Sequence, residues 1–287
     1  MQAMQWRGRR GSRNIQDRRR SGGGGLAVGG AGGLGVLAIV VVGYFLGVDL
    51  TPLLGGSDGA VQTGAQRELT QDEEEAGQFV SVVLADTEQV WGQVFPEQLN
   101  ATYQPPVLVL FSGRTSSACG VAGSATGPFY CPPDQQVYLD TDFFVTLQQQ
   151  LGAGGDFAAA YVVAHEVAHH VQNLTGTLGE ANRVRGQVGE AQSNAISVRI
   201  ELQADCYAGL WARLAEDRLG VIERGDIAEA MNAASRIGDD TLQRQSGQVV
   251  RPDSFTHGTS EQRQRWFARG YEEPLMANCD TFSAERL

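Results

Sequence analysis

Two histidines four residues apart, in His165-Glu-Val-Ala-His169, limit the possible fold more than any other feature of this sequence. Residues at i and i+4 share one face of an α-helix, so both imidazoles can reach a single metal ion only if this segment is helical. Glu166 stands beside the first histidine, where its carboxylate can act as a base on water whose pKa a bound zinc lowers. Small and apolar residues precede the motif at 158–164. The motif therefore predicts a buried helix that carries a zinc site.

A zinc site that leaves room for a substrate takes three protein ligands, so a third must come from elsewhere in the chain. Gln172 and Thr175 occupy the Gly and His places of the longer pattern H-E-x-x-H-x-x-G-x-x-H, which excludes that arrangement. A glutamate from a later helix is the alternative, and the candidates are Glu180, Glu190 and Glu201. We favour Glu201, because apolar residues surround it in the sequence; otherwise it is a solvated helix acid.

Asp205 follows Glu201 by one helical turn. Two carboxylates at this spacing can divide the work, since one can bind the metal while the other accepts a ring N–H from a ligand histidine and fixes its tautomer. We expect Asp205 to have this supporting role, with a purely structural role as the alternative.

The two other histidines lead to different predictions. His257 lies in Ser254-Phe-Thr-His-Gly258, just before the last expected helix, where it could donate a hydrogen bond to the oxyanion of a peptide substrate. It could equally hold its loop by hydrogen bonding. His170 points off the metal face of its helix and is expected to be a surface or packing residue. Arg263 is expected to form a salt bridge, with an active-site carboxylate as one option.

An uncharged stretch of 23 residues runs from Leu26 to Val48. As a helix it would be about 34 Å long, enough to cross the roughly 30 Å core of a bilayer. Seven arginines and one acid lie within residues 1–20. Because positive charge stays in the cytoplasm, we expect a single-pass membrane protein with a cytoplasmic N-terminus and an extracytoplasmic body. A cleaved secretory signal is the alternative.

The chain divides into four expected parts. Residues 1–25 form a basic cytoplasmic arm, expected to be disordered; 26–48 a transmembrane helix; 49–69 a flexible linker; and 70–287 the metallopeptidase domain. The whole chain carries a net charge of −11, so the part beyond the arm is strongly acidic. Such a body argues against nucleic acid as a partner, because phosphate contacts need Lys and Arg. The sequence leaves the oligomeric state unknown.

Strands are expected early and helices late, which indicates an α+β fold that is mostly helical with a small sheet. Thr70-Gln-Asp-Glu73 has the form of a capping box and should start a helix that ends near Pro96. Two strands are expected, at 107–111 and around Val137, and the second could be an edge to which an extended peptide adds. Further helices are expected at 157–175 with Asp156 as N-cap, at 182–219, from Asp226 to Gly238, and from a capping box at Thr259.

Four cysteines lie beyond the apolar stretch, which suggests two disulfides in an exported domain. Three connectivities are possible. We favour Cys119–Cys131, which closes a short loop, and Cys206–Cys279, which ties the C-terminal tail to a helix; four reduced thiols are the alternative.

Four ordered blocks of this sequence closely resemble the bacterial putative neutral zinc metallopeptidase family. They are Gly127-Pro-Phe-Tyr-Cys131 with Val137-Tyr-Leu139, His165 to Gln172, Glu201 to Gly209, and Ser254 to Arg263. The similarity covers roughly residues 70–285. The resemblance implies a gluzincin-type zincin fold in which His165, His169 and Glu201 bind Zn²⁺ and Glu166 is the general base.

The sequence thus favours a membrane-anchored zinc metallopeptidase that acts on a peptide or protein substrate. One alternative is a non-catalytic extracytoplasmic binding module that keeps zinc for stability. Another is a membrane scaffold in which the motif is accidental.

Overall fold

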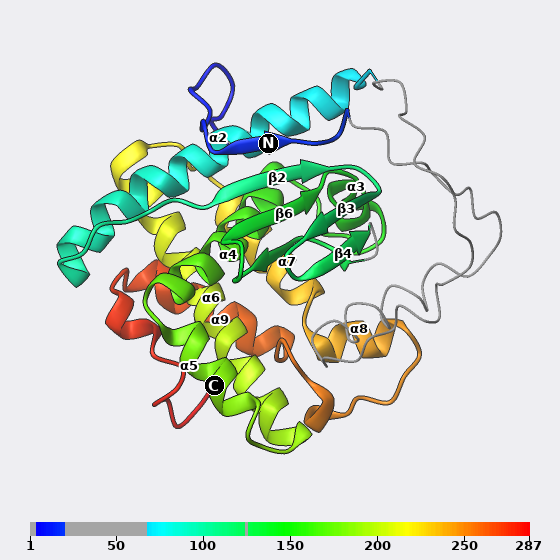
Figure 1. The fold of residues 1–287 in the computed structure, drawn as a ribbon, viewed down its shortest axis with the longest axis vertical. Coiled ribbons are helices and arrows are strands. Elements are labelled where there is room, and N and C mark those ends of the chain that lie inside the picture. Colours follow the sequence, from blue (N-terminus) through cyan, green and yellow to red (C-terminus); the bar gives the residue numbers. More distant parts are fainter. Residues whose placement is uncertain (1–3, 21–67, 124–125) are drawn as a thin grey trace.

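A computed structural model describes residues 4–20, 68–123 and 126–287 and shows a small sheet against a larger body of helices (Figure 1). The sheet has the strand order β1 (Ile15–Asp17), β2 (Val107–Phe111), β6 (Gln136–Asp140) and β5 (Phe129–Cys131). The first three strands are parallel, and β5 runs antiparallel to β6. The expected α+β architecture, mostly helical with a small sheet, is confirmed for the described residues.

The sheet is buried on both faces. Side chains alternate along a strand, so Leu108 and Leu110 join the main core with the helices, whereas Val109 and Phe111 join a second, smaller core. A hairpin of β3 (Arg114–Ser117) and β4 (Gly120–Gly123) contributes Ala122 to that second core. Helices therefore occupy one side of the sheet and the hairpin packs on the other.

The helical part surrounds one central helix, α4, which is buried along most of its length. The helices are α2 (Gln71–Val94), α3 (Asp142–Gln149), α4 (Asp156–Leu174), α5 (Thr177–Arg185), α6 (Glu190–Leu219), α7 (Asp226–Arg236), α8 (Asp239–Gln245) and α9 (Ser260–Glu272). A π-helical turn (Phe95–Leu99) continues α2, and short 3-10 turns lie at Pro252–Ser254 and Met276–Cys279. The capping boxes expected at Thr70 and Thr259 are both present.

Two glycines allow α6 and α9 to touch through their backbones. A Cβ on Gly209 would lie 2.0 Å from the carbonyl oxygen of Phe267, and one on Gly270 would lie 1.8 Å from that of Cys206. Any side chain at either position would push the helices apart. This contact fixes the distance between α9 and the residues of α6 that precede Gly209.

Several expected boundaries were wrong. The helix expected at 182–219 is two helices, because the chain turns between Gly186 and Gly189. Asp156 and Asp226 are the first residues of their helices rather than N-caps; glycines with positive φ precede both. The strand at Val137 is also not an edge, since β6 lies between β2 and β5.

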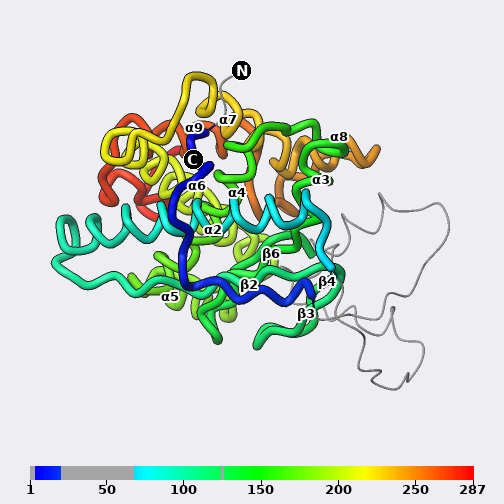
Figure 2. The backbone as a smooth tube through the Cα atoms, turned by 90° about the horizontal axis from the view of Figure 1, so that it is seen from above, coloured from blue at the N-terminus to red at the C-terminus, as the bar shows by residue number. Residues whose placement is uncertain are grey.

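The prediction of a disordered basic arm is wrong for residues 4–20. Strand β1 pairs in parallel with β2, with Ile15 opposite Leu108. Trp6 is buried against the body, and Arg9 forms a forked pair with the buried Asp86 at 2.5 and 2.6 Å. Figure 2 shows this segment in blue, passing α2 on its way to the sheet. The many arginines of this segment suggested a disordered arm. A guanidinium group that pairs with a carboxylate can, however, pack against the folded body.

No helix within residues 4–20, 68–123 and 126–287 is long and apolar enough to cross a membrane. The transmembrane helix expected at 26–48 and nearly all of the linker expected at 49–69 lie outside the described residues. The transmembrane anchor and its orientation therefore stay predictions.

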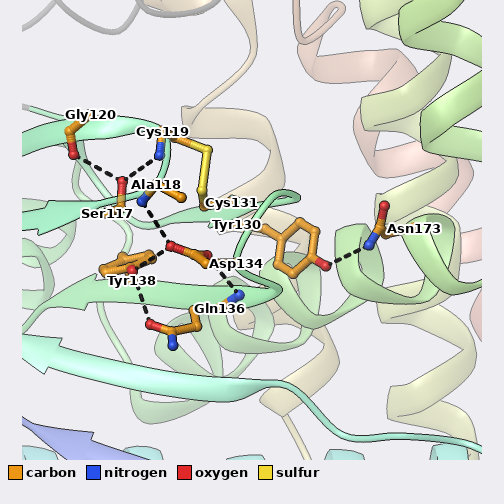
Figure 3. Close-up of a disulfide and its surroundings, with 10 residues drawn as sticks. All are labelled: Ser117, Ala118, Cys119, Gly120, Tyr130, Cys131, Asp134, Gln136, Tyr138 and Asn173. Atoms are coloured by element: carbon orange, nitrogen blue, oxygen red, sulfur yellow. Dashed lines mark hydrogen bonds between the residues drawn. A yellow bond between two sulfur atoms is a disulfide. The ribbon is translucent and has the colours of Figure 1, made fainter.

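Both favoured disulfides are present, Cys119–Cys131 and Cys206–Cys279. The first joins the turn of the β3–β4 hairpin to β5 (Figure 3). The second joins α6 to the C-terminal tail, as the sequence suggested.

Candidate metal centre

The helix α4 carries His165 and His169 on the same face, and α6 brings Glu201 against them. The Nε2 atom of His165 lies 3.1 Å from Oε2 of Glu201, and Nε2 of His169 lies 3.5 Å from Oε1. All three residues are less than a tenth exposed. The residues that sequence analysis proposed as ligands are therefore brought together, although 36 positions separate His165 from Glu201.

These donors fit zinc in both kind and spacing. Zinc binds imidazole nitrogen and carboxylate oxygen at about 2.0–2.2 Å, and tetrahedral geometry then separates two such ligands by about 3.4 Å. The observed separations of 3.1 and 3.5 Å are close to this value. The other two candidate glutamates lie elsewhere: Glu180 pairs with Arg183 on the surface, and Glu190 is exposed at the start of α6.

Asp205 supports His165 from behind. Its Oδ1 lies 2.9 Å from Nδ1 of His165 and accepts the hydroxyl of Tyr161 at 2.5 Å. Arg263 donates to both oxygens of Asp205, at 2.8 and 2.9 Å. Since a carboxylate only accepts here, His165 carries a proton on Nδ1, so Nε2, the atom that faces Glu201, is the nitrogen that can bind a metal ion. The expected salt bridge of Arg263 is thus made with Asp205. Tyr161 also belongs to the residues hydrogen-bonded to Asp205, and sequence analysis missed it.

Gln172 has the matching place behind His169. Its Oε1 lies 2.9 Å from Nδ1 of His169, and the Gln172 side chain is fully buried. In the sequence, Gln172 excluded a longer motif and ended one of the four family blocks, but it was assigned no role at the metal site. Its spacing of three residues from His169, on the same helical face, was the signal available.

Charge in the site favours a bound cation. Burial alone lowers the pKa of His165, but the carboxylates of Asp205 and Glu201 outweigh this and raise that pKa to about 10. Burial alone raises the pKa of Glu201, but the facing histidines hold it well below its usual range. The same negative field that retains a proton here would stabilise a divalent metal ion.

Glu166 is placed to act beside this site. It lies on α4 next to His165, is 8% exposed, and is not part of the group of ligand atoms that converge among the described residues. Burial raises the pKa of Glu166, while the neighbouring histidines act in the opposite direction. A raised pKa suits a carboxylate that must take up a proton and release it again.

His257 reaches the site from the loop before α9. Its Nδ1 lies 3.2 Å from Oδ1 of Asp239, whose Oδ2 also accepts the backbone N–H groups of Thr256, His257 and Gly258. Burial lowers the pKa of His257, but Asp239 and Glu201 raise it overall. Asp239 therefore orients His257 and holds its loop, and the oxyanion-donor role of this histidine stays a prediction. Asp239 was missed, because nothing in the sequence links it to a residue 18 positions away.

His170 is a packing residue, as expected. Its Nδ1 lies 3.0 Å from the hydroxyl of Tyr130 in β5, and its Nε2 lies 2.7 Å from the carbonyl oxygen of Gln104. Asn173 also donates to the Tyr130 hydroxyl (Figure 3). The two bonds to the Tyr130 hydroxyl join the edge strand β5 to the helix of the metal centre.

Comparisons with known proteins agree with this site. The family model described as "Putative neutral zinc metallopeptidase" matches residues 4–282. The chain is 48% identical to the uncharacterized protein YpfJ of Escherichia coli (strain K12), over 97% of this chain and 99% of that protein. It is 44% identical to the uncharacterized protein Rv2575 of Mycobacterium tuberculosis (strain ATCC 25618 / H37Rv), over 74% of each. No solved structure matches significantly. From the match over nearly its whole length, we conclude that the chain belongs to the putative neutral zinc metallopeptidase family, whose cofactor is Zn²⁺.

Proposed function

We propose that this protein is a zinc-dependent peptidase that hydrolyses peptide bonds. One observation carries the proposal: Glu201 lies between the Nε2 atoms of His165 and His169, with Glu166 next to them but outside the converging group. A site that only stabilises a fold needs no acid in that place. Family membership supports the proposal, because the family is one of zinc metallopeptidases.

His165, His169 and Glu201 would hold the metal. Bound zinc supplies a Lewis acid that polarises the scissile carbonyl and makes water easier to deprotonate. Glu166 takes the proton from the attacking water and passes it to the leaving amine. His257, oriented by Asp239, donates a hydrogen bond to the oxygen on which negative charge develops.

The edge strand β5 is the proposed docking place for an extended substrate. It ends the sheet and is joined to α4 through Tyr130. A peptide added in the β conformation would use backbone hydrogen bonds for affinity and side-chain pockets for preference. This replaces the strand at Val137, which is internal.

The second candidate is a non-catalytic module that keeps zinc for stability. Burial favours it: His165, Glu166 and His169 are only 6%, 8% and 9% exposed, which leaves a peptide little access in this conformation.

Replacement of Glu166 by Gln separates the two candidates. Zinc content and cleavage of a peptide library, with and without chelator, should be measured for the wild type and E166Q. Glu180→Gln is the matched control, because Glu180 lies on the surface of α5. We expect E166Q to retain zinc and lose cleavage, while E180Q behaves as the wild type. Zinc binding without any cleavage by the wild type would favour the non-catalytic module. Undiminished cleavage by E166Q would refute the assignment of the base.

A further inference from the structure

A chain of buried amides leads away from His169 on the side opposite Glu201. Gln172 lies 2.9 Å from Nδ1 of His169 through its Oε1, and its Nε2 donates to the carbonyl oxygen of Ile200 at 2.8 Å and to Oε1 of Gln203 at 3.1 Å. Nε2 of Gln203 in turn donates to the carbonyl oxygen of Cys279 at 3.0 Å. Gln172 is 0% exposed and Gln203 is 5% exposed, so water does not compete for these bonds.

The far end of this chain determines the direction of every bond in it. The carbonyl oxygens of Ile200 and Cys279 can only accept, so each glutamine must turn its NH₂ group toward them. The amide oxygen of Gln203 then faces Gln172, and the amide oxygen of Gln172 faces His169. An amide oxygen cannot donate, so Nδ1 of His169 must carry the proton.

The consequence for the metal centre is a fixed tautomer. With the proton on Nδ1, the lone pair of His169 is on Nε2, the atom that lies 3.5 Å from Glu201. His165 reaches the same state by a different route, because the carboxylate of Asp205 accepts its Nδ1–H. The charged carboxylate of Asp205 thus fixes the tautomer of His165, and the neutral glutamine chain fixes the tautomer of His169.

The end of the neutral chain is held by a disulfide. Cys279 belongs to the C-terminal tail, and its bond to Cys206 ties the tail to α6 three residues after Gln203. The carbonyl that orients Gln203 therefore stays in place only while the tail stays on α6.

We propose that Gln172 and Gln203 are positioning residues for the zinc ligand His169, and that the Cys206–Cys279 disulfide holds the end of their hydrogen-bond chain. The inference rests on the metal site of the proposed function, but not on peptide cleavage. Supporting hydrogen bonds of this kind are commonly worth 10–100-fold in metal affinity.

The test is the zinc dissociation constant of the full-length protein, measured by competition with a chromophoric chelator. Gln172→Leu removes all three side-chain hydrogen bonds of Gln172 at nearly constant volume. Gln149→Leu, on the exposed end of α3, is the control. We expect a rise of about 10–100-fold for Q172L and none for Q149L. Q172E, which keeps an acceptor for His169, should lie between Q172L and the wild type. Q203L and reduction of the disulfide should each cause a smaller rise. An unchanged constant in folded Q172L would overturn the proposal.

A measurement on the wild type keeps the proposal testable if Q172L does not fold. Nitrogen-15 NMR of the zinc-loaded protein should show His169 protonated at Nδ1 and bound to metal through Nε2. Metal binding through Nδ1 would overturn the proposal. Failure of the wild type to bind zinc at all would instead refute the proposed function, so the two failures are distinguishable. Cleavage activity does not enter either measurement.

Discussion

The buried pair of Asp205 and Arg263 allows two roles of one carboxylate to be separated. Asp205 neutralises Arg263 through two hydrogen bonds and also accepts the Nδ1–H of His165. Asp205 is 0% exposed and Arg263 is 2% exposed. Asp205→Asn removes the charge, Arg263→Met removes its partner, and the double variant removes both.

The expected magnitudes follow from this burial. Loss of one partner leaves the other charge buried and uncompensated, which commonly costs about 3–5 kcal/mol. We expect each single variant to lose stability in this range, Arg263→Met less because His165 and Tyr161 still donate to Asp205. The double variant should be more stable than the sum of the two losses implies, by about 1–3 kcal/mol.

Zinc affinity should follow a different order. Asp205→Asn weakens the acceptor of the His165 proton, so the zinc dissociation constant should rise about 10–100-fold in this variant and in the double variant. Arg263→Met keeps that acceptor and should change the constant less.

Urea unfolding of zinc-free protein gives the stabilities, and chelator competition gives the affinities. Zinc must be absent from the first measurement, because a ligand of the folded state raises apparent stability. The reasoning is refuted if the double variant loses the full sum of stability, or if Asp205→Asn binds zinc as the wild type does.

Three further predictions concern regions outside the zinc site. Gly270→Ala should lower the free energy of unfolding, measured in urea, by about 1–3 kcal/mol or more, because the added Cβ would overlap the backbone of α6. The control is Gly179→Ala, where an added Cβ would have nothing within 4 Å, and it should be neutral or slightly stabilising. Burial raises the pKa of Asp226 to about 6, with help from neighbouring carboxylates. Because the folded pKa exceeds the unfolded one, the free energy of unfolding should fall as the pH rises from about 4 to 6. Asp226→Asn should reduce that slope and raise the free energy of unfolding by about 1 kcal/mol at pH 7. In intact cells, a membrane-impermeant maleimide should label cysteines placed at Arg10 and Glu273 alike, since strand pairing puts the arm and the body on one side of any membrane; labelling of only one would support a single crossing.

Local signals made much of this fold predictable. Both capping boxes use residues three positions apart, so the starts of α2 and α9 could be located from the sequence. The helical motif at His165 is equally local. Glu201 was harder, because its choice among three glutamates depended on apolar neighbours rather than on spacing.

Contacts between distant segments account for what was missed. Strand β1 has only three residues, lies among arginines, and exists because β2 is there to pair with it. The break before Gly189 and the glycine N-caps depend on backbone conformation, for which helical periodicity gives no signal. Gln172 and Asp239 are polar residues of common types, and their roles appear only when α6 and the loop before α9 lie beside α4 and α8.

The central claim is that His165, His169 and Glu201 bind one zinc ion. Anomalous diffraction at the zinc edge from crystals of the zinc-loaded protein tests it most directly. We expect a single strong peak about 2.0–2.2 Å from Nε2 of both histidines and from a carboxylate oxygen of Glu201. Among the described residues, Asp156, Asp226 and Glu229 form a second cluster that could hold a metal ion. A peak at this cluster, with none at the histidines, would contradict the account.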